Sequence, residues 1–477
     1  MSLEPPTYLA SLQSNIRQRP IPWDGAVRAG TLTEEQYETI RAVDKAKNAE
    51  QRRHVVEADV DAYRLLFVGG PDRPSVLETA AKHANVIQYI LVLLTDLVQA
   101  VPSLAKALLD TREPYQHFLP LLRSTAPEDP IPLLTAHALA DIASLARDES
   151  SATRQALPVI LTYLSGLAKS SDAGLQDIAV QECSSLLYGH VSRDQFWKQR
   201  SETVAPLIAI LQSAAGINGE NTTANLWSGV STVRSAGLDG SLGGGVGLQL
   251  LYHVLLVMWQ LSFEADEIGD ELNDEYDIVL LYSHLLRLSP KEKTTRLMLS
   301  TLYNLLDKNQ KTLLPTAVLA RLPALLVNLS SRHLTDPDLL EELESLKALL
   351  DEYTKTKTTL DEYVAEVQSG HLRWSPPHRS QTFWAENARK ILEFENGEIA
   401  RRLADIMQKP WDNDKQVLAI ACNDIGCLVK EVPERRHQLE KVGLKRRVME
   451  LMQSDDENVR WESLRALGGW LKYSFEQ

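Results

Sequence analysis

The chain has 477 residues, a formal net charge of −14 and 44% hydrophobic residues. One hydrophobic core seldom supports a chain of this length, so two or more packed units are expected. The acidic balance argues against general nucleic-acid binding, because a phosphate backbone binds to a basic surface. The composition fits a soluble cytosolic protein whose partners are other proteins.

Residues 1–20 contain several prolines and little hydrophobic patterning, which predicts an extended N-terminal tail. Helical periodicity follows, and residues 21–350 form a predicted N-terminal domain of repeated helices. Its prolines fall near helix starts or just past helix ends, where a missing N–H group does least harm. The predicted helices are 31–67, 75–83, 84–100, 102–109, 114–122, 131–147, 154–169, 173–189, 201–213, 248–263, 273–288, 293–307, 316–330 and 337–352.

A glycine-rich stretch, residues 213–247, interrupts these helices and holds 9 of the chain's 23 glycines. A loop of this length in a compact helical protein is uncommon and is usually functional or mobile. Its Gly-Gly-Gly-Val-Gly run lacks the lysine of a Walker A sequence and the last glycine of a dinucleotide-binding loop, and no predicted strand precedes it. We therefore predict a flexible insertion and no nucleotide site.

The segment 351–380 is a predicted hinge that leads to a smaller C-terminal armadillo-like domain, residues 381–477. Within residues 336–366, 10 acidic residues stand against 3 basic ones. A solvated helix face is the simplest interpretation of this charge. The alternative is a surface that binds a basic groove on a partner.

A pattern of large, small and large apolar residues recurs along the chain at positions i, i+4 and i+8, which lie on one face of a helix. One pair of matching stretches is 42 residues apart and another is 41 apart. A period near 42 is typical of armadillo and HEAT repeats, in which each helix set buries its apolar face against the next. The matching residues are Val417, Ala421 and Ile425 with Val459, Ser463 and Leu467, and Leu134, Ala138 and Ile142 with Leu175, Ala179 and Cys183.

Large aromatic residues lie on both sides of a rigid proline pair that begins at Pro376. They either dock the C-terminal domain onto its own first helix or contact a partner protein. Trp384 is predicted to be a core residue, because the apolar face of its helix continues beyond it. Trp374 lies outside any predicted helix and is the better candidate for a partner contact, and Phe383 is a further candidate.

No sequence motif for catalysis or metal binding is recognisable: HExxH, GxSxG and paired Cys/His ligands are missing from the sequence. His371 and His378 flank the proline pair and are predicted to lie on a loop surface, with His378 a candidate partner contact. The three cysteines are predicted to be buried apolar residues of a protein in a reducing compartment. We predict no enzyme activity, no cofactor and no metal.

The N-terminus has no apolar segment behind basic residues, so we expect no signal peptide. The most apolar runs, 87–101 and 248–263, are shorter than the roughly 20 residues that a bilayer requires, and we expect no membrane crossing.

The segment 434–447 is basic in an otherwise acidic chain, with six Lys and Arg against two Glu. It is predicted to be a loop and helix start near the tip of the C-terminal domain. Such a patch would attract an acidic partner surface, and a solvated helix-turn face is the alternative. The candidate contact residues are Arg435, Arg436, Arg446 and Arg447.

The sequence SGHLRWSPPHRSQTFW, residues 369–384, resembles the family of the regulatory H subunit of the vacuolar-type proton ATPase. So do DEYVAEV at 361–367, the helix at 416–425 and the ending MELMQSDDENVRWESLRAL at 449–467. The resemblance is dense over 351–477 and thin over the first 60 residues. It implies a right-handed superhelix of HEAT/armadillo-like repeats with a smaller C-terminal helical domain.

The resemblance also implies a regulatory role without catalysis. Peripheral stalk subunits E and G would hold the N-terminal domain, and the cytosolic part of subunit a would contact the C-terminal domain on the cytosolic face of the vacuolar or another endomembrane. When the two sectors of the pump separate, the C-terminal domain would move onto rotor and catalytic subunits and stop ATP hydrolysis. The predicted hinge would allow this movement.

Two other functions remain to be distinguished: an armadillo adapter that binds extended peptides, and an enzyme with an unrecognised site. Such adapters typically repeat Trp-x-x-x-Asn along their groove, and none of the nine tryptophans here has Asn four residues later. The regulatory function is therefore preferred.

Overall fold

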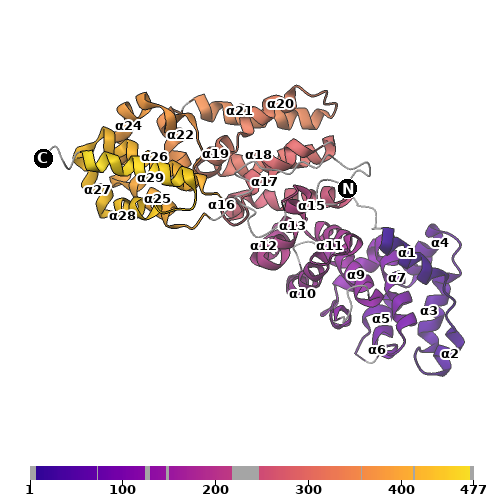
Figure 1. Cartoon of the computed structure of the whole chain (residues 1–477). Helices are drawn as coiled ribbons and strands as arrows, with labels where there is room; N and C mark the ends of the chain where they lie inside the picture. The colour runs from indigo at the N-terminus through magenta and orange to yellow at the C-terminus, as the bar shows by residue number, and fades with distance from the viewer. Residues whose placement is uncertain are drawn as a thin grey trace. The chain divides into compact units, whose positions relative to one another are not determined.

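The computed structural model describes residues 7–71, 73–123, 129–146, 150–217, 246–289, 291–355, 357–411 and 414–472. These residues form two compact units: unit 1 contains 7–214 and 246–268, and unit 2 contains 215–217 and 269–472. Both units are built from helices (Figure 1), and the described residues contain no strand beyond a single isolated bridge between Gly70 and Arg73. The all-α prediction is confirmed. Most of the predicted insertion at 213–247 lies outside the described residues.

The helices of unit 1 pack mainly through a series of long apolar elements, in which α7 contacts α9, α9 contacts α11 and α11 contacts α15. Two of its elements, η1 and η2, are short 3-10 helices. The bounds are α1 (Thr7–Gln18), α2 (Trp23–Arg28), α3 (Glu34–Asp44), α4 (Ala49–Ala58), α5 (Val60–Val68), α6 (Val76–Thr79), α7 (Ala84–Ala100), α8 (Pro102–Leu109), η1 (Leu119–Leu122), α9 (Pro130–Ala146), α10 (Ser151–Ala168), α11 (Ala173–Leu186), α12 (His190–Lys198), α13 (Arg200–Ala214), α15 (Leu248–Leu261), η2 (Ser262–Glu264) and α16 (Ala265–Tyr276), which contains the division between the units.

Unit 2 continues the same organisation, with α18 against α21 and α26 against α29. The bounds are α17 (Ile278–Leu288), α18 (Glu292–Lys308), α19 (Gln310–Leu319), α20 (Leu322–Ser330), α21 (Pro337–Lys355), α22 (Thr359–Ser369), α23 (Pro376–Arg379), α24 (Gln381–Glu393), η3 (Phe394–Asn396), α25 (Glu398–Gln408), α26 (Gln416–Glu431), η4 (Pro433–Arg435), α27 (Arg436–Lys441), α28 (Leu444–Leu451) and α29 (Glu457–Lys472).

The repeat period is visible in side-chain hydrogen bonds that join helices one repeat apart. Four such bonds link residues 42 positions apart, at distances between 2.6 and 2.9 Å. Equivalent positions of consecutive repeats therefore face each other, as the sequence period predicts. The pairs are Gln99 with Asp141 in unit 1, and Arg296 with Asp338, Ser300 with Glu342 and Arg435 with Glu393 in unit 2.

The repeated apolar pattern forms the helix-to-helix core in both places where the sequence shows it. Eleven of its twelve residues are buried, and Leu467 is partly buried against the same core. Close approach of α26 and α29 depends on glycine, because a Cβ atom on Gly426 would lie 3.0 Å from the Cα atom of Ala466. Small residues at this crossing permit the contact that the stacking requires.

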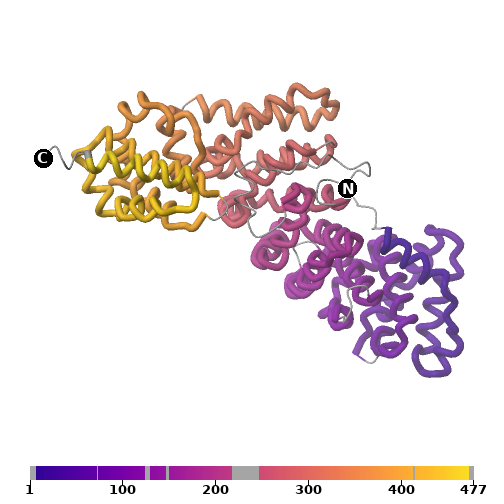
Figure 2. Tube along the Cα trace, in the orientation of Figure 1, coloured from indigo at the N-terminus to yellow at the C-terminus, as the bar shows by residue number. Residues whose placement is uncertain are grey.

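The predicted extended tail is wrong for residues 7–18, which form α1. Leu9 and Ile16 are buried, and α1 packs against α7 (Figure 2). Arg17 fixes this contact with a hydrogen bond from its Nε atom to Asp96, 3.0 Å long. The apolar positions 9 and 16 form one helix face over two turns, a signal that the nearby prolines obscured.

Two predicted helices are each interrupted by a residue with left-handed backbone geometry. Asp277 (φ 49°) separates α16 from α17, and Arg321 (φ 58°) separates α19 from α20. Because neither position holds glycine, no turn signal is present in the sequence there. The predicted hinge, 351–380, contains the end of α21 together with α22 and α23, and α22 packs against α19 and α25.

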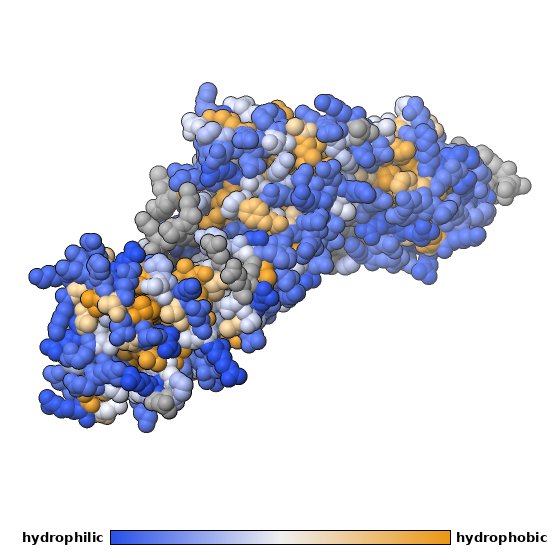
Figure 3. Space-filling view, turned by 180° about the vertical axis from the view of Figure 1, so that it is seen from behind, coloured by the Kyte–Doolittle hydropathy of each residue, from blue (hydrophilic) through white to orange (hydrophobic). Residues whose placement is uncertain are grey.

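Hydrophilic residues cover most of the face shown in Figure 3, with small hydrophobic patches between them. Among the exposed large apolar residues, Trp461, Leu464 and Leu471 lie on α29.

Candidate partner-binding site

The aromatic segment around the proline pair is held by well-defined local structure on both sides. Thr358 begins α22 with a capping box to Asp361, and Gly370 ends it with φ 80°. Pro376 occupies the first turn of α23, where proline is tolerated. Ser380 then caps α24 by accepting a hydrogen bond of 3.1 Å from the N–H of Phe383. Residues 371–375 are therefore a short loop fixed between two helix ends.

A buried histidine joins this loop region to the core of the C-terminal part. The Nδ1 atom of His378 lies 2.8 Å from the Asp424 carboxylate, and its Nε2 atom lies 3.1 Å from the Glu366 carboxylate. The side chains of His378 and Asp424 are fully buried. The three residues come from α23, α26 and α22, so one imidazole ties three helices together.

Other polar groups complete the network around the two carboxylates. Glu366 accepts hydrogen bonds from the backbone N–H of Arg373 (2.6 Å) and the hydroxyl of Ser375 (2.7 Å). Asp424 accepts from the hydroxyl of Tyr363 (3.2 Å) and the amide of Asn423 (3.1 Å). Both carboxylates thus have several donors each, which is what buried charged groups require.

The protonation of the network follows from these contacts. Burial acts to lower the pKa of His378, but the charge and hydrogen bonds of Asp424 and Glu366 outweigh it and raise that pKa to about 10. Burial raises the pKa of Asp424, and the His378 cation opposes this effect. At neutral pH the imidazole is therefore protonated, and both of its N–H groups donate to carboxylates.

The prediction that His378 lies on a loop surface is wrong, because the sequence could not show that two distant carboxylates enclose it. Phe383 and Trp384 are buried as well, at 6% and 2% exposure. The indole N–H of Trp384 donates to the backbone carbonyl of His378 (3.4 Å). Neither His378 nor Phe383 presents a side chain to a partner in this structure, and their candidate role there is replaced by a role in the core.

Trp374 and Pro376 remain accessible. Pro376 is exposed, and Trp374 is partly buried at the edge of the same core. The guanidinium of Arg379 lies 5.1 Å from the centre of the Trp374 ring, close enough for a cation–π contact. Trp374 also lines two hollows: a cavity of about 450 Å³ towards α19 and α21, and a groove of about 710 Å³ along α26 and α29.

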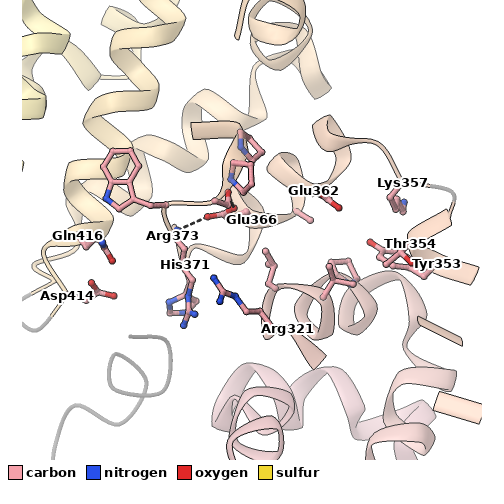
Figure 4. Close-up of a pocket in the computed structure, with 18 residues that line it drawn as sticks. Arg321, Tyr353, Thr354, Lys357, Glu362, Glu366, His371, Arg373, Asp414 and Gln416 are labelled. Carbon is pink, nitrogen blue, oxygen red and sulfur yellow. Dashed lines mark hydrogen bonds between the residues drawn. The ribbon is translucent and has the colours of Figure 1, made fainter. Parts of the chain in front are cut away.

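The cavity of about 450 Å³ is lined by α19, the Arg321 turn, the end of α21, α22, the 371–377 segment and the start of α26. Figure 4 shows Arg321, His371 and Arg373 together at one end, with Asp414 beside them and Lys357 and Glu362 at the other end. Burial, followed by the nearby charges of Lys409, Arg373 and Arg402, lowers the pKa of His371 to about 4, so this imidazole is neutral. The site therefore combines fixed cations with a neutral ring.

The basic segment 434–447 spans η4, α27 and the first turn of α28. Arg435 pairs with Glu393 (2.6 Å), and Arg446 and Arg447 both pair with Glu450 (3.6 and 3.0 Å). Arg447 also donates from Nε to the carbonyl of Met407 (2.8 Å). Arg436 makes no side-chain hydrogen bond or ion pair with any described residue. Two neighbouring glutamates thus offset part of the basic charge that the segment has on its own.

A group of three candidate metal ligands occurs once among the described ranges, in unit 1, where donor atoms of His190, Glu264 and Glu267 lie within 4.8 Å of one another. Arg193 lies 2.7 Å from Glu264 and His190 lies 2.7 Å from its other oxygen. Glu264 already has two cationic partners, so this group is best described as an ion-pair cluster.

Comparison with known proteins accounts for both parts of the chain. The family of the V-ATPase H subunit matches residues 7–350 through one characteristic region and residues 356–475 through another. The chain belongs to the V-ATPase H subunit family. The resemblance of the segment at 369–384 is confirmed, and the boundary between the two family regions falls next to the short connection between α21 and α22.

Relatives in the V-ATPase H subunit family span most of the chain. The V-type proton ATPase H subunit of Drosophila melanogaster is 26% identical and covers 98% of this chain and 91% of its own length. The probable V-type proton ATPase H subunit of Oryza sativa is 26% identical over 94% of both chains. A probable V-type proton ATPase H subunit of Caenorhabditis elegans is 32% identical over 46% of this chain and 49% of its own.

Among solved structures, a designed armadillo repeat protein aligns with a TM-score of 0.35 and 14% identity, covering 66% of this chain and 98% of its own. As for membrane spans, no single described helix is long and apolar enough to cross a bilayer. Two bent pairs reach that length and composition only when joined, α7 with α8 and α19 with α20.

The sequence interpretation missed the buried network, although part of its signal was present. Asp424 lies within the apolar run VLAIACNDIGCLV, where an isolated carboxylate needs a partner. That partner, His378, is 46 residues away. Only the fold brings the two together.

Proposed function

We propose that this chain is a non-catalytic regulatory and bridging subunit of a V-type proton ATPase. In the assembled pump it joins the peripheral stalk, subunits E and G, to the cytosolic part of subunit a and so couples ATP hydrolysis to proton transport. After the sectors separate, its C-terminal part binds rotor and catalytic subunits and inhibits ATP hydrolysis. It lies on the cytosolic face of the membrane through the complex alone.

The observation that carries this proposal is the match of one family to both parts of the chain, residues 7–350 and 356–475. A bridging subunit needs two surfaces that can engage different partners. The connection between α21 and α22 is short and begins at Lys355, so small changes of backbone angles there would reorient one part against the other. The residues 351–380 keep their proposed role as a hinge.

The accessible residues of the C-terminal part give this function a contact surface. Trp374 and Pro376 offer an apolar contact, and Arg436 and Arg446 offer charges that are only weakly engaged within the chain. An acidic partner would meet these cations first, because charge complementarity acts over roughly a Debye length of 8–10 Å before contact.

The test uses V-ATPase peripheral sector prepared without its H subunit. Adding the purified chain should lower the rate of ATP hydrolysis by the detached sector. Adding it to membranes that carry the assembled pump should raise proton transport per ATP hydrolysed. Co-purification should recover subunits E and G. If the chain binds the stalk but changes neither rate, the regulatory role is refuted; if it binds no pump subunit, the bridging role is refuted too.

A further inference from the structure

The cavity of about 450 Å³ in unit 2 has a cationic end that the contacts within the chain do not fully use. Arg321 has a positive φ of 58° at the start of α20, which directs its side chain away from the helix axis and into the cavity (Figure 4). Its guanidinium makes no hydrogen bond or ion pair with any residue that the structure describes. It is an anchored cation with five available N–H donors.

Arg373 reaches the same end of the cavity from the opposite wall. Its backbone N–H is held by Glu366 at 2.6 Å, which fixes the loop that carries it. Burial and the charges of Arg321 and Arg287 act to lower the pKa of the Arg373 guanidinium, against the attraction of Asp414 and Glu366. Two like charges from separate elements are thus held near each other, and an anion between them would relieve their repulsion.

Asp414 is the carboxylate beside this cationic end, and Arg373 acts to lower its pKa against the larger effect of burial. Glu366 also lines the cavity, but its oxygens already accept hydrogen bonds from His378, Ser375 and Arg373. One carboxylate facing two guanidinium groups leaves net positive charge at this end.

The remaining wall is mainly uncharged. Val318 and Leu319 line it from α19, Pro376 and Pro377 from α23, and the Trp374 ring from the loop. A volume of about 450 Å³ falls within the range typical of sites for small organic ligands, which pair an apolar wall with a few polar groups. An inorganic ion alone would leave this wall uncovered.

We propose that the cavity binds a phosphorylated small molecule, whose phosphate lies between the guanidinium groups of Arg321 and Arg373 and whose organic part lies against the apolar wall. Guanidinium groups suit this ligand because they form two parallel hydrogen bonds with phosphate oxygens. The same chemistry would accept either a soluble organic phosphate or the headgroup of a phosphorylated lipid.

Such a ligand would join the two family regions, because Arg321 belongs to 7–350 and Arg373 to 356–475. Its binding would hold the connection between α21 and α22 in the geometry seen here. The regulatory consequence rests on the proposed function: a bound ligand would slow the movement of the C-terminal part and so reduce inhibition of the detached sector.

Binding is measured by calorimetry on the full chain with inorganic phosphate, with adenosine monophosphate, and with phosphatidylcholine vesicles that contain or lack phosphatidylinositol 4-phosphate. We expect the monophosphate or the phosphoinositide vesicles to bind more tightly than inorganic phosphate. Arg321→Gln should weaken that binding about tenfold or more. Asp414→Asn should strengthen it, because the substitution removes the opposing charge. Arg28→Gln, which removes an exposed arginine on α2, is the matched control and should bind as the unmodified chain does.

A second measurement follows the connection itself. Trypsin should cleave after the exposed residues Lys355 and Lys357 more slowly when the ligand is present, and this protection should disappear in Arg321→Gln. If none of the three probes binds at millimolar concentration, or if Arg321→Gln and Arg28→Gln bind equally, the site is refuted. Either result leaves inhibition of the detached sector intact, whereas loss of inhibition with binding retained refutes the regulatory function alone.

Discussion

Replacing His378 with alanine would remove the one cation that lies between two buried carboxylates. In the folded chain the pKa of His378 is raised to about 10, against an ordinary value of 6.5. At ~1.36 kcal/mol per pH unit, this difference corresponds to roughly 5 kcal/mol of stabilisation. Breaking a buried ion pair by removing one partner typically costs about 3–5 kcal/mol. We therefore expect His378→Ala to lower the free energy of unfolding of unit 2 by about 3–5 kcal/mol.

The pH dependence gives a sharper test than the magnitude. Because folding raises the pKa of His378, its stabilisation is fully present below pH 6.5 and is lost as the pH rises through about 10. The assay is denaturant unfolding, followed by tryptophan fluorescence, at several pH values between 6 and 10 for the unmodified chain and for His378→Ala. The difference between the two proteins should shrink steadily over this range. Taking the difference removes the contribution of His137, whose pKa is raised to about 9 in unit 1 by Glu182 and Asp141 against the effect of burial.

His371→Ala is the matched control, because this imidazole is seven residues away and neutral, with a pKa lowered to about 4. Its truncation removes a ring contact with Trp411 (5.8 Å between ring centres) and should give a small loss that does not change between pH 6 and 10. A loss below about 1 kcal/mol for His378→Ala, or a difference that stays constant with pH, would contradict the account of the buried network.

Three further predictions concern the hinge, the basic segment and the aromatic residues. Fragments 1–350 and 351–477 should each show a cooperative melt by circular dichroism, and a C-terminal fragment without a transition would move the boundary. Arg436→Glu with Arg446→Glu should weaken inhibition of the detached sector, more at low salt, since neither side chain bonds to the backbone; unchanged inhibition would exclude the basic segment as a contact. Trp384→Ala should cost about 3–5 kcal/mol of stability. Trp374→Ala should leave the melt nearly unchanged and weaken binding to the sector by about 2 kcal/mol, and a collapsed fold would make Trp374 structural.

The sequence predicted the helical repeats well, because their signal is local and recurs. The apolar triplets at 134–142 and 417–425 fall within one helix each, and a period near 42 identifies which helices pack together. Helix interruptions were harder to predict. Asp277 and Arg321 adopt a left-handed conformation without glycine, so tertiary packing and not local preference determines where those helices end.

The candidate site was only partly predictable for a related reason. The aromatic segment at 369–384 is distinctive in one dimension, and the resemblance to the family could be recognised there. Burial is a property of three dimensions. Whether a histidine beside two prolines faces solvent depends on α22 and α26, which supply Glu366 and Asp424. Arg321 and Arg373 likewise share a cavity although 52 residues separate them.

The hydrogen bonds between equivalent positions of consecutive repeats have a consequence for how the chain can change over evolution. A substitution at one member of such a pair leaves a polar group without its partner one repeat away. Arg296 with Asp338 and Arg435 with Glu393 should therefore vary together among relatives, each pair changing as a unit while the 42-residue separation is kept. Insertions would accumulate between repeats, where they disturb no pair, and a lengthened repeat would have to move every later partner by the same amount.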